Sequence, residues 1–383
     1  MIRQRNDKNI QTQLGIIPLG WNIKRLGEIC TYFKSGTSIT SKLLKENGEY
    51  PVYGGNGLRG YSDKYTHDGT YILIGRQGAL CGNINFVEGK NFISEHAIAV
   101  QSNEHMMWLK YKLEYWNLNR FSESSAQPGL SVEKLVRYKL TIPPFSEQQK
   151  IAEILNIWDK AIEKQRQLIE KLELRKKGLM QQLLTGKKRL PGFSEEWKEV
   201  RLGELFIERN EINRVNLPLL SITADRGVIF QAESDKRDIS NDDKSKYKRI
   251  CPNDIGYNTM RMWQGRCALS SLEGIVSPAY TIITPNKDVN PHYMEMLFKQ
   301  PFTMYCFWTH SQGLVSDTLN CKFPDFSQIK VTIPSLKEQN AISCLFMEIN
   351  HEIEFYKQRL NLLHQEKKGL MQVLLTGKKR VTI

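Results

Sequence analysis

Three polar loops carry the side chains best suited to reading nucleic-acid bases. They span Tyr53–Tyr61, Gly75–Gly82 and Tyr257–Gly265. Glycine lets a backbone approach a partner closely, arginine pairs bidentately with guanine, and asparagine or glutamine pairs with adenine in the major groove. The candidate DNA contacts in these loops are Asn56, Arg59, Arg76, Gln77, Asn258, Arg261, Trp263 and Gln264. Turns between strands use the same residue types, so a structural role for any one of them is the alternative.

A basic run, Lys244, Lys246 and Lys248 followed by Arg249, is a further candidate for DNA contact. Residues 1–145 contain 18 Lys and Arg against 12 Asp and Glu, whereas residues 190–334 contain 17 against 18. The second region is therefore expected to bind a polyanion only through a local patch of this kind. Acidic side chains are interleaved with the basic ones over 235–249, so a solvated charged loop is the alternative.

The sequence contains no recognisable catalytic constellation. Gly55, Gly57 and Gly60 have the spacing of a dinucleotide-binding loop, but no apolar-periodic helix follows them. Ile142-Pro-Pro-Phe145 resembles an amino-methyltransferase loop, yet isoleucine cannot accept the hydrogen bond which that chemistry requires. The seven cysteines include no C-x-x-C pair, so we expect neither a disulfide framework nor a zinc site. The chain is expected to hold no metal and no cofactor of its own.

The overall charge points to a polyanionic partner. The 54 Lys and Arg exceed the 41 Asp and Glu by 13, and the pI is about 9.3. No stretch approaches the roughly 18 apolar residues of a membrane-spanning helix, and the polar start of the chain lacks the apolar core of a secretory signal. We therefore expect a cytoplasmic protein that does not enter a membrane.

The elements that would position these loops are duplicated. GLMQQLLTGKKR, residues 178–189, returns as GLMQVLLTGKKR at 369–380, with eleven of twelve positions identical. WNIKRLGE at 21–28 likewise returns as WKEVRLGE at 197–204. Between these matching ends the two inserts show no resemblance by eye. The sequence therefore predicts a common frame that carries two divergent inserts.

Each copy closes with a long heptad-patterned segment, because apolar residues recur in alternating steps of three and four. The predicted coiled-coil interface comprises Ile151, Leu155, Trp158, Ile162, Ile169 and Leu172 in the first copy and Ile342, Phe346, Ile349, Ile353, Tyr356, Leu360 and Leu363 in the second. Two amphipathic helices that pack only on their own domains are the alternative. Short connections favour an antiparallel pair, which would make the molecule a single-chain pseudo-dimer.

The duplicated order resembles the DNA-specificity subunit of type I restriction–modification systems over nearly the whole chain. The resemblance rests on the two W-x-x-x-x-L-G-E entries, the two helices that end in L-L-T-G-K, and the dissimilar middles. It implies an α+β fold with pseudo-two-fold character, in which two globular target-recognition domains are joined by two long helices in an antiparallel coiled coil. The boundaries are residues 1–145 for the first domain, 146–189 for the first helix, 190–334 for the second domain and 335–383 for the second helix and tail.

The resemblance also implies partners. Each domain would read one half of a bipartite double-stranded DNA site. Two modification subunits would bring S-adenosylmethionine and methylate adenine, and two restriction subunits would bring ATP, Mg²⁺ and cleavage. Two rival readings are a stand-alone DNA methyltransferase or nuclease, and a coiled-coil adaptor that never touches DNA. Within the domains we expect strands up to about residue 100 and over 219–283, and helices near 104–121 and 291–308.

Overall fold

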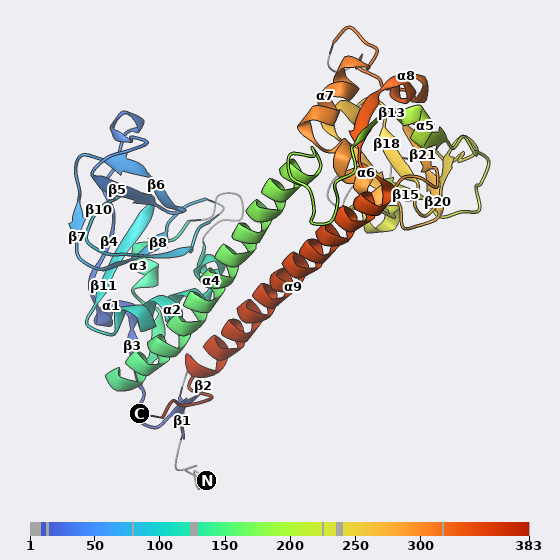
Figure 1. Cartoon of the computed structure of the whole chain (residues 1–383). Coiled ribbons are helices and arrows are strands. Elements are labelled where there is room, and N and C mark those ends of the chain that lie inside the picture. Colours follow the sequence, from blue (N-terminus) through green and yellow to red (C-terminus); the bar gives the residue numbers. More distant parts are fainter. Residues whose placement is uncertain are drawn as a thin grey trace. The chain divides into compact units, whose positions relative to one another are not determined.

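The computed structural model describes residues 9–12, 15–78, 80–122, 129–223, 226–234, 240–315 and 318–382 (Figure 1). The chain divides into two compact units. Unit 1 comprises Met1–Gln167 together with Gln358–Ile383, and unit 2 comprises Leu168–Lys357. Unit 1 is thus built from both ends of the chain, whereas unit 2 is one continuous segment.

Two helices of 39 residues, α4 (Phe145–Leu183) and α9 (Leu336–Leu374), contribute to both units. In unit 1, Asp159 of α4 pairs with Lys367 of α9 at 2.5 Å, and Arg166 contacts His364 at 3.3 Å. Residue numbers rise along one helix and fall along the other, so the helices run antiparallel in this unit. In unit 2, Glu173 pairs with Lys357 at 2.7 Å, and apolar residues near the end of α4 pack against those near the start of α9.

The heptad positions explain why these long, strongly charged helices pair. The predicted interface residues are all buried or half-buried, while their neighbours along the helices are mostly exposed. In unit 1, Ile151 and Leu155 join a core cluster that contains Leu374 and Leu375. The corresponding cluster of unit 2 joins Leu183 and Leu184 to Ile342 and Phe346.

The first domain is α+β and has two four-stranded sheets. One has the order β4-β11-β8-β9 and the other the order β6-β5-β10-β7, and strand pairs β1-β2 and β12-β3 complete the unit. The strands are β1 (Asn9–Thr12), β2 (Gly15–Pro18), β3 (Asn22–Arg25), β4 (Cys30–Ser35), β5 (Tyr50–Gly54), β6 (Gly57–Ser62), β7 (His67–Asp68), β8 (Tyr71–Gly75), β9 (Ile84–Val87), β10 (Lys90–Ile93), β11 (Ala97–Ser102) and β12 (Lys139–Ile142). The helices are α1 (Leu26–Ile29), η1 (Ser41–Leu43), α2 (Met106–Trp116), η2 (Leu118–Phe121) and α3 (Val132–Leu135).

The second domain repeats much of this plan. Its main sheet has the order β14-β21-β18-β19, and β13-β22, β15-β16 and β17-β20 form pairs. The strands are β13 (Lys198–Arg201), β14 (Phe206–Glu208), β15 (Leu220–Ile222), β16 (Val228–Phe230), β17 (Lys248–Ile250), β18 (Ile255–Asn258), β19 (Cys267–Leu269), β20 (Gly274–Val276), β21 (Tyr280–Pro285) and β22 (Lys330–Ile333). The helices are α5 (Leu202–Leu205), η3 (Gln231–Glu233), η4 (Met262–Gln264), α6 (Pro291–Phe298), α7 (Pro301–Thr309) and α8 (Phe323–Gln328).

The expected distribution of strands and helices is confirmed, with a break in each helical region. Asn117, in the left-handed conformation at φ 49°, ends α2, and Pro301 begins α7 after α6 has ended. The main sheets share one strand order, because β4, β11, β8 and β9 correspond to β14, β21, β18 and β19. The two inserts therefore have the same central topology although their sequences show no resemblance by eye.

In each unit, an arginine that follows one long helix pairs with a buried glutamate near the start of the other long helix. In unit 1, Arg380 from the tail after α9 pairs with Glu147 of α4, whose carboxylate also accepts a hydrogen bond from the Trp21 indole at 3.0 Å. In unit 2, Arg189 from the segment after α4 donates two hydrogen bonds of 2.6 Å to Glu338 of α9. Both glutamate side chains are 1% exposed. The segment after α9 thus binds unit 1 through an arginine–glutamate pair, and the segment after α4 binds unit 2 through a pair of the same kind.

Candidate nucleic-acid interface

The loop after β8 presents Arg76 and Gln77. Arg76 is half-buried and Gln77 is exposed. The backbone on both sides of these side chains is fixed, because the Arg76 N–H donates to His96 and the Arg76 carbonyl accepts from Leu130. Gln77 also forms an isolated bridge with Gly129. The loop is therefore held by main-chain bonds, which leaves its side chains available to a ligand. Ala79, within the Gly75–Gly82 loop, lies outside the described residues.

The turn that carries Asn56 lies against this loop. A Cβ at Gly55 would lie 2.9 Å from the carbonyl oxygen of His96 and 3.4 Å from the Gly75 Cα, and a Cβ at Gly75 would lie 2.7 Å from the Gly55 oxygen. Only glycine permits this approach. The structure thus brings exposed Asn56 close to Arg76 and Gln77, although the strands that carry the two loops belong to different sheets.

Arg59 has a different setting. It lies on β6 and is exposed. Its aliphatic chain crosses Gly54, since a Cβ at Gly54 would lie 2.6 Å from the Arg59 Cδ. Glycine at position 54 is therefore what makes room for this arginine.

The loop after β18 carries the corresponding group in the second domain. Arg261 and Gln264 are exposed, at the two ends of the turn that contains η4. Asn258 and Trp263 brace the loop instead: the Asn258 side-chain oxygen accepts from the Met260 N–H at 3.0 Å, and the Trp263 indole donates to the Met260 carbonyl at 3.1 Å. Of the four candidates here, Arg261 and Gln264 are thus the ones best placed to reach a ligand.

The two loops occupy equivalent places. Each connects the third strand of its main sheet to the edge strand, β8 to β9 in the first domain and β18 to β19 in the second. A segment from later in the sequence of each domain supports its loop. The Leu130 N–H donates to the Arg76 carbonyl, and the Cys321 N–H donates to the Thr259 carbonyl at 2.9 Å. Reasoning from sequence missed these supporting segments. The sequence around Leu130 and Cys321 shows no motif that would have marked these contacts.

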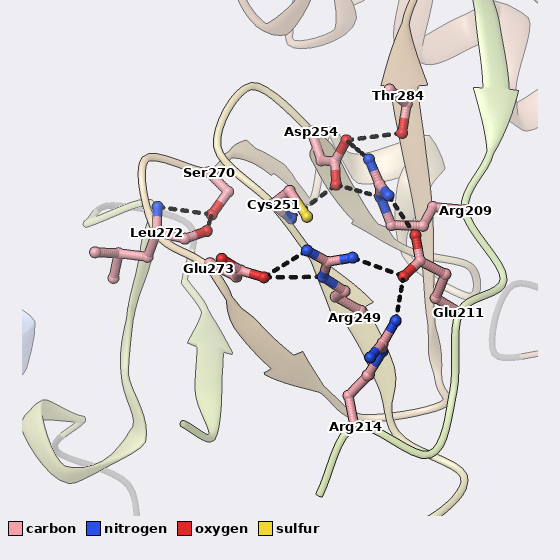
Figure 2. Close-up of polar contacts among 10 residues, drawn as sticks. All are labelled: Arg209, Glu211, Arg214, Arg249, Cys251, Asp254, Ser270, Leu272, Glu273 and Thr284. Atoms are coloured by element: carbon pink, nitrogen blue, oxygen red, sulfur yellow. Dashed lines mark hydrogen bonds and ion pairs between the residues drawn. The ribbon is translucent and has the colours of Figure 1, made fainter. Parts of the chain in front are cut away.

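A buried ion-pair network fixes the start of β18. Asp254, 1% exposed, accepts two hydrogen bonds from Arg209, the nearer at 2.7 Å, and one from the Thr284 hydroxyl at 2.7 Å (Figure 2). Arg209 also pairs with Glu211 at 2.6 Å. Because Asp254 immediately precedes β18, this network positions the strand whose other end carries Arg261.

The network extends to the basic run. Arg249 pairs with Glu211 at 2.8 Å and with Glu273 at 2.6 Å. The guanidinium groups of Arg249 and Arg209 hold the pKa of the Glu211 carboxyl below its usual value. Glu211 is therefore ionised at neutral pH and compensates charge in this region.

The three lysines of this run differ in their surroundings. Lys248 pairs with Glu208 at 3.5 Å, the ammonium of Lys244 lies 5.4 Å from the Tyr247 ring centroid, and Lys246 is exposed. Because Lys248 and Arg249 are paired with carboxylates, the run presents less positive charge than its sequence suggests. Residues 235–239, at the start of the charged segment, lie outside the described residues. Among the described residues, no hydrogen bond or ion pair joins these lysines to the loop after β18.

Across the described ranges, no three His, Cys, Asp or Glu side chains gather in a way that would hold a metal ion. No helix of the described chain is long and apolar enough to cross a membrane.

The sequence and the fold were compared with those of known proteins. The sequence model of the family described as "Type I restriction modification DNA specificity domain" matches residues 18–174. The specificity subunit of the type I restriction enzyme EcoprrI from Escherichia coli is 42% identical over 142 residues, which are 36% of this chain and 35% of that subunit. The MjaVIII specificity subunit of Methanocaldococcus jannaschii is 24% identical over 98% of this chain and 97% of its own length. Residues 18–174 therefore carry a type I restriction–modification DNA-specificity domain, and the chain is similar to specificity subunits over nearly its whole length.

A solved structure shares the fold of this chain. The S subunit of a type I restriction–modification system from M. genitalium superposes with a TM-score of 0.60 and 15% sequence identity, over 97% of this chain and 98% of that one. The similarity to specificity subunits and the α+β fold therefore agree with the resemblance that rests on the duplicated sequence. The match to the EcoprrI subunit spans about a third of that protein.

Proposed function

We propose that this chain is a noncatalytic specificity subunit and selects the DNA sequence on which a type I restriction–modification complex acts. Each recognition domain reads one half of a bipartite double-stranded target, through the loop after β8 in the first domain and the loop after β18 in the second. One observation carries the proposal: two inserts of unlike sequence place an Arg and a Gln on the same connection of the same sheet, with Gln77, Arg261 and Gln264 exposed and Arg76 half-buried. Such a pair of loops suits two half-sites of different sequence.

Base readout is tested by alanine variants. Arg76→Ala or Gln77→Ala should relax base preference in one half-site by about 1–3 kcal/mol and leave the other intact, with the reverse for Arg261→Ala or Gln264→Ala. The measurement is binding to a panel of single-base variants of the target, with thermal melts alongside. Lys246→Ala is the control, because loss of a phosphate contact weakens all sequences alike. A uniform loss from the arginine and glutamine variants would remove them from the readout.

The coiled coil is proposed to fix the spacing of the half-sites. Deleting one heptad from each helix, residues 162–168 and 358–364, spares the pairs Asp159–Lys367 and Glu173–Lys357. The deletion shortens each helix by about 10 Å. We expect the permitted spacer to shrink by about three base pairs, or binding to be lost, while both half-sequences stay the same. An unchanged spacer in a binding selection would show that the helices do not set the separation.

The same helices are proposed to bind the partner subunits. Outside the interface, α4 keeps Ile157 and Leu174 exposed at 67% and 71%, and α9 keeps Phe355 and Leu362 exposed at 60% and 57%. Exposed apolar side chains on a helix commonly mark a surface for another protein. We propose two modification and two restriction subunits as partners, which carry S-adenosylmethionine, ATP and Mg²⁺. The complex would act on DNA in the cytoplasm.

The rival readings make different predictions. A stand-alone methyltransferase would transfer a labelled methyl group from S-adenosylmethionine to DNA without partners, and a stand-alone nuclease would cut DNA alone. An adaptor that never touches DNA would leave the sequence selectivity of the reconstituted complex unchanged when residues 31–140 are exchanged for another insert. Our proposal requires no transfer by the purified chain, and a change in one half-site only after the exchange.

A further inference from the structure

A pocket of about 510 Å³ in unit 1 is separate from the two DNA-facing loops. It is enclosed by strand β2, the end of α2 with η2, strand β12 and the segment after α9. Its lining combines aromatic rings with cations and contains no carboxylate. The residues are Ile16, Ile17, Lys112, Tyr115, Trp116, Arg120, Phe121, Tyr138, Lys139, Leu140, Thr141, Thr376 and Lys378.

Lys112 at the base of this pocket is a buried cation, and no carboxylate among the described residues pairs with it. Its side chain is 4% exposed. The ammonium donates to the Thr141 hydroxyl at 3.1 Å and to the Leu375 carbonyl at 2.6 Å, which are both neutral acceptors. An ammonium has three N–H donors, so one donor and the whole positive charge remain to be satisfied. Burying an uncompensated charge is costly, which makes this lysine the unusual feature of the pocket.

Packing does not require a lysine here. Helices α2 and α6 begin at equivalent places, since the His105 N–H donates to Gln148 and the Asn290 N–H donates to Gln339, both at 2.9 Å. Counting seven residues along each helix aligns Lys112 with Leu297, which lies in the core of unit 2. The same fold is therefore built with leucine at this position, so the fold itself does not require a buried lysine here.

The walls of the pocket suit a planar ring. The Phe121 and Tyr138 rings lie 4.2 Å apart, the Trp116 ring lies 6.4 Å from Phe121, and the Arg120 guanidinium lies 4.5 Å from the Phe121 centroid. Aromatic and guanidinium faces of this kind stack on nucleic-acid bases. The cations at the rim and the base of the pocket, in turn, suit a group with more than one negative charge.

We propose that this pocket binds a free nucleoside phosphate, with the phosphate on Lys112 and the rim cations and the base against the aromatic wall. The pocket volume falls within the range typical of small-ligand sites. The proposal is independent of DNA recognition by the two loops, because no residue of the pocket belongs to them.

Binding should depend on pH through Lys112. Burial lowers the pKa of this lysine to about 7. The other titratable or charged groups that line the pocket, from every element around it, are Tyr115, Arg120, Tyr138, Lys139 and Lys378. A bound anion favours the ammonium form, so binding takes up a proton near neutral pH. Affinity should fall by about tenfold as the pH rises from about 7 to about 8.5, and Lys112→Met should lack this dependence.

The test is calorimetry on the full chain with AMP, ADP, adenosine and inorganic phosphate as separate probes. We expect saturable binding of AMP and ADP, at least tenfold weaker binding of adenosine and of inorganic phosphate, and at least a tenfold loss in Lys112→Met. Arg120→Ala, at an exposed position, should weaken binding without unfolding the domain. Lys330→Met, the unit 2 counterpart of Lys139, is the matched control and should bind normally, because Lys330 pairs with Glu199 and does not line this pocket.

Three results would overturn the proposal. The first is the absence of saturable AMP or ADP binding up to about 10 mM. The second is equal affinity for AMP and inorganic phosphate, since the aromatic wall would then contribute nothing. The third is that the chain binds a 5′-phosphorylated single-stranded oligonucleotide but no mononucleotide, and that the pocket variants abolish this binding. That result would assign the pocket to a nucleic-acid phosphate instead.

Discussion

Arg209→Met should destabilise the second recognition domain by about 3–5 kcal/mol, because it leaves the carboxylate of Asp254 buried and without its charged partner. Asp254 is 1% exposed, and its other hydrogen bonds come from the Thr284 hydroxyl and the Cys251 N–H. Urea unfolding followed by circular dichroism measures the loss. The unfolding of unit 1 serves as an internal reference in the same experiment.

Arg214→Met is the matched control for this substitution. Arg214 lies at the exposed edge of the network, 3.8 Å from Glu211, with 55% of its side chain exposed. An exposed pair of this kind contributes at most about 1 kcal/mol. Equal losses from the two variants would show that burial of Asp254 does not decide the energetics. We also expect Arg209→Met to impair readout of the second half-site before the first, since β18 would lose its anchor.

Arg380→Met should destabilise unit 1 by about 3 kcal/mol, because Glu147 would remain buried with only the Trp21 indole as its side-chain partner. The exposed neighbour Lys379→Met is the control and should have little effect. The double variant Arg380→Met with Glu147→Gln should recover much of the stability, since it removes the buried charge and keeps a hydrogen-bond acceptor for the indole. Failure of this rescue in thermal or urea unfolding would mean that Arg380 acts by some means other than neutralising Glu147.

The repeated frame was predictable because its signals are local. A heptad pattern and a near-identical dodecapeptide are visible in the sequence, and they required the two long helices. The common sheet order of the inserts was not predictable in the same way, because it depends on pairings such as β4 with β11 that join residues far apart in the chain. Unlike sequences satisfy the same pairings, since backbone hydrogen bonds and buried apolar faces specify them.

The candidate DNA contacts were predictable as residue types in loops but not as a site. Sequence alone could not place Asn56 beside Arg76, because their proximity depends on the contact of Gly55 with Gly75. Lys248 pairs with Glu208 and Arg249 pairs with Glu273, and each partner lies more than twenty residues away in the sequence. Sequence alone could not show these pairs. Nor could it distinguish buried Lys112 from the surface lysines around it, because its burial arises from the docking of the segment after α9.

The two-part construction of unit 1 sets the order in which this protein can fold during synthesis. Its core cluster includes Leu374 and Leu375, which the ribosome adds only after it has made the whole of Leu168–Lys357. At about 5–20 residues per second, the 190 residues of Leu168–Lys357 take about 10–40 s to make. Throughout that interval the first domain lacks the end of α9 that completes its core. Unit 2 is a continuous segment and can fold as it emerges. A nonsense mutation that removes Leu374 and Leu375 would therefore damage the first recognition domain, although that domain is encoded before them.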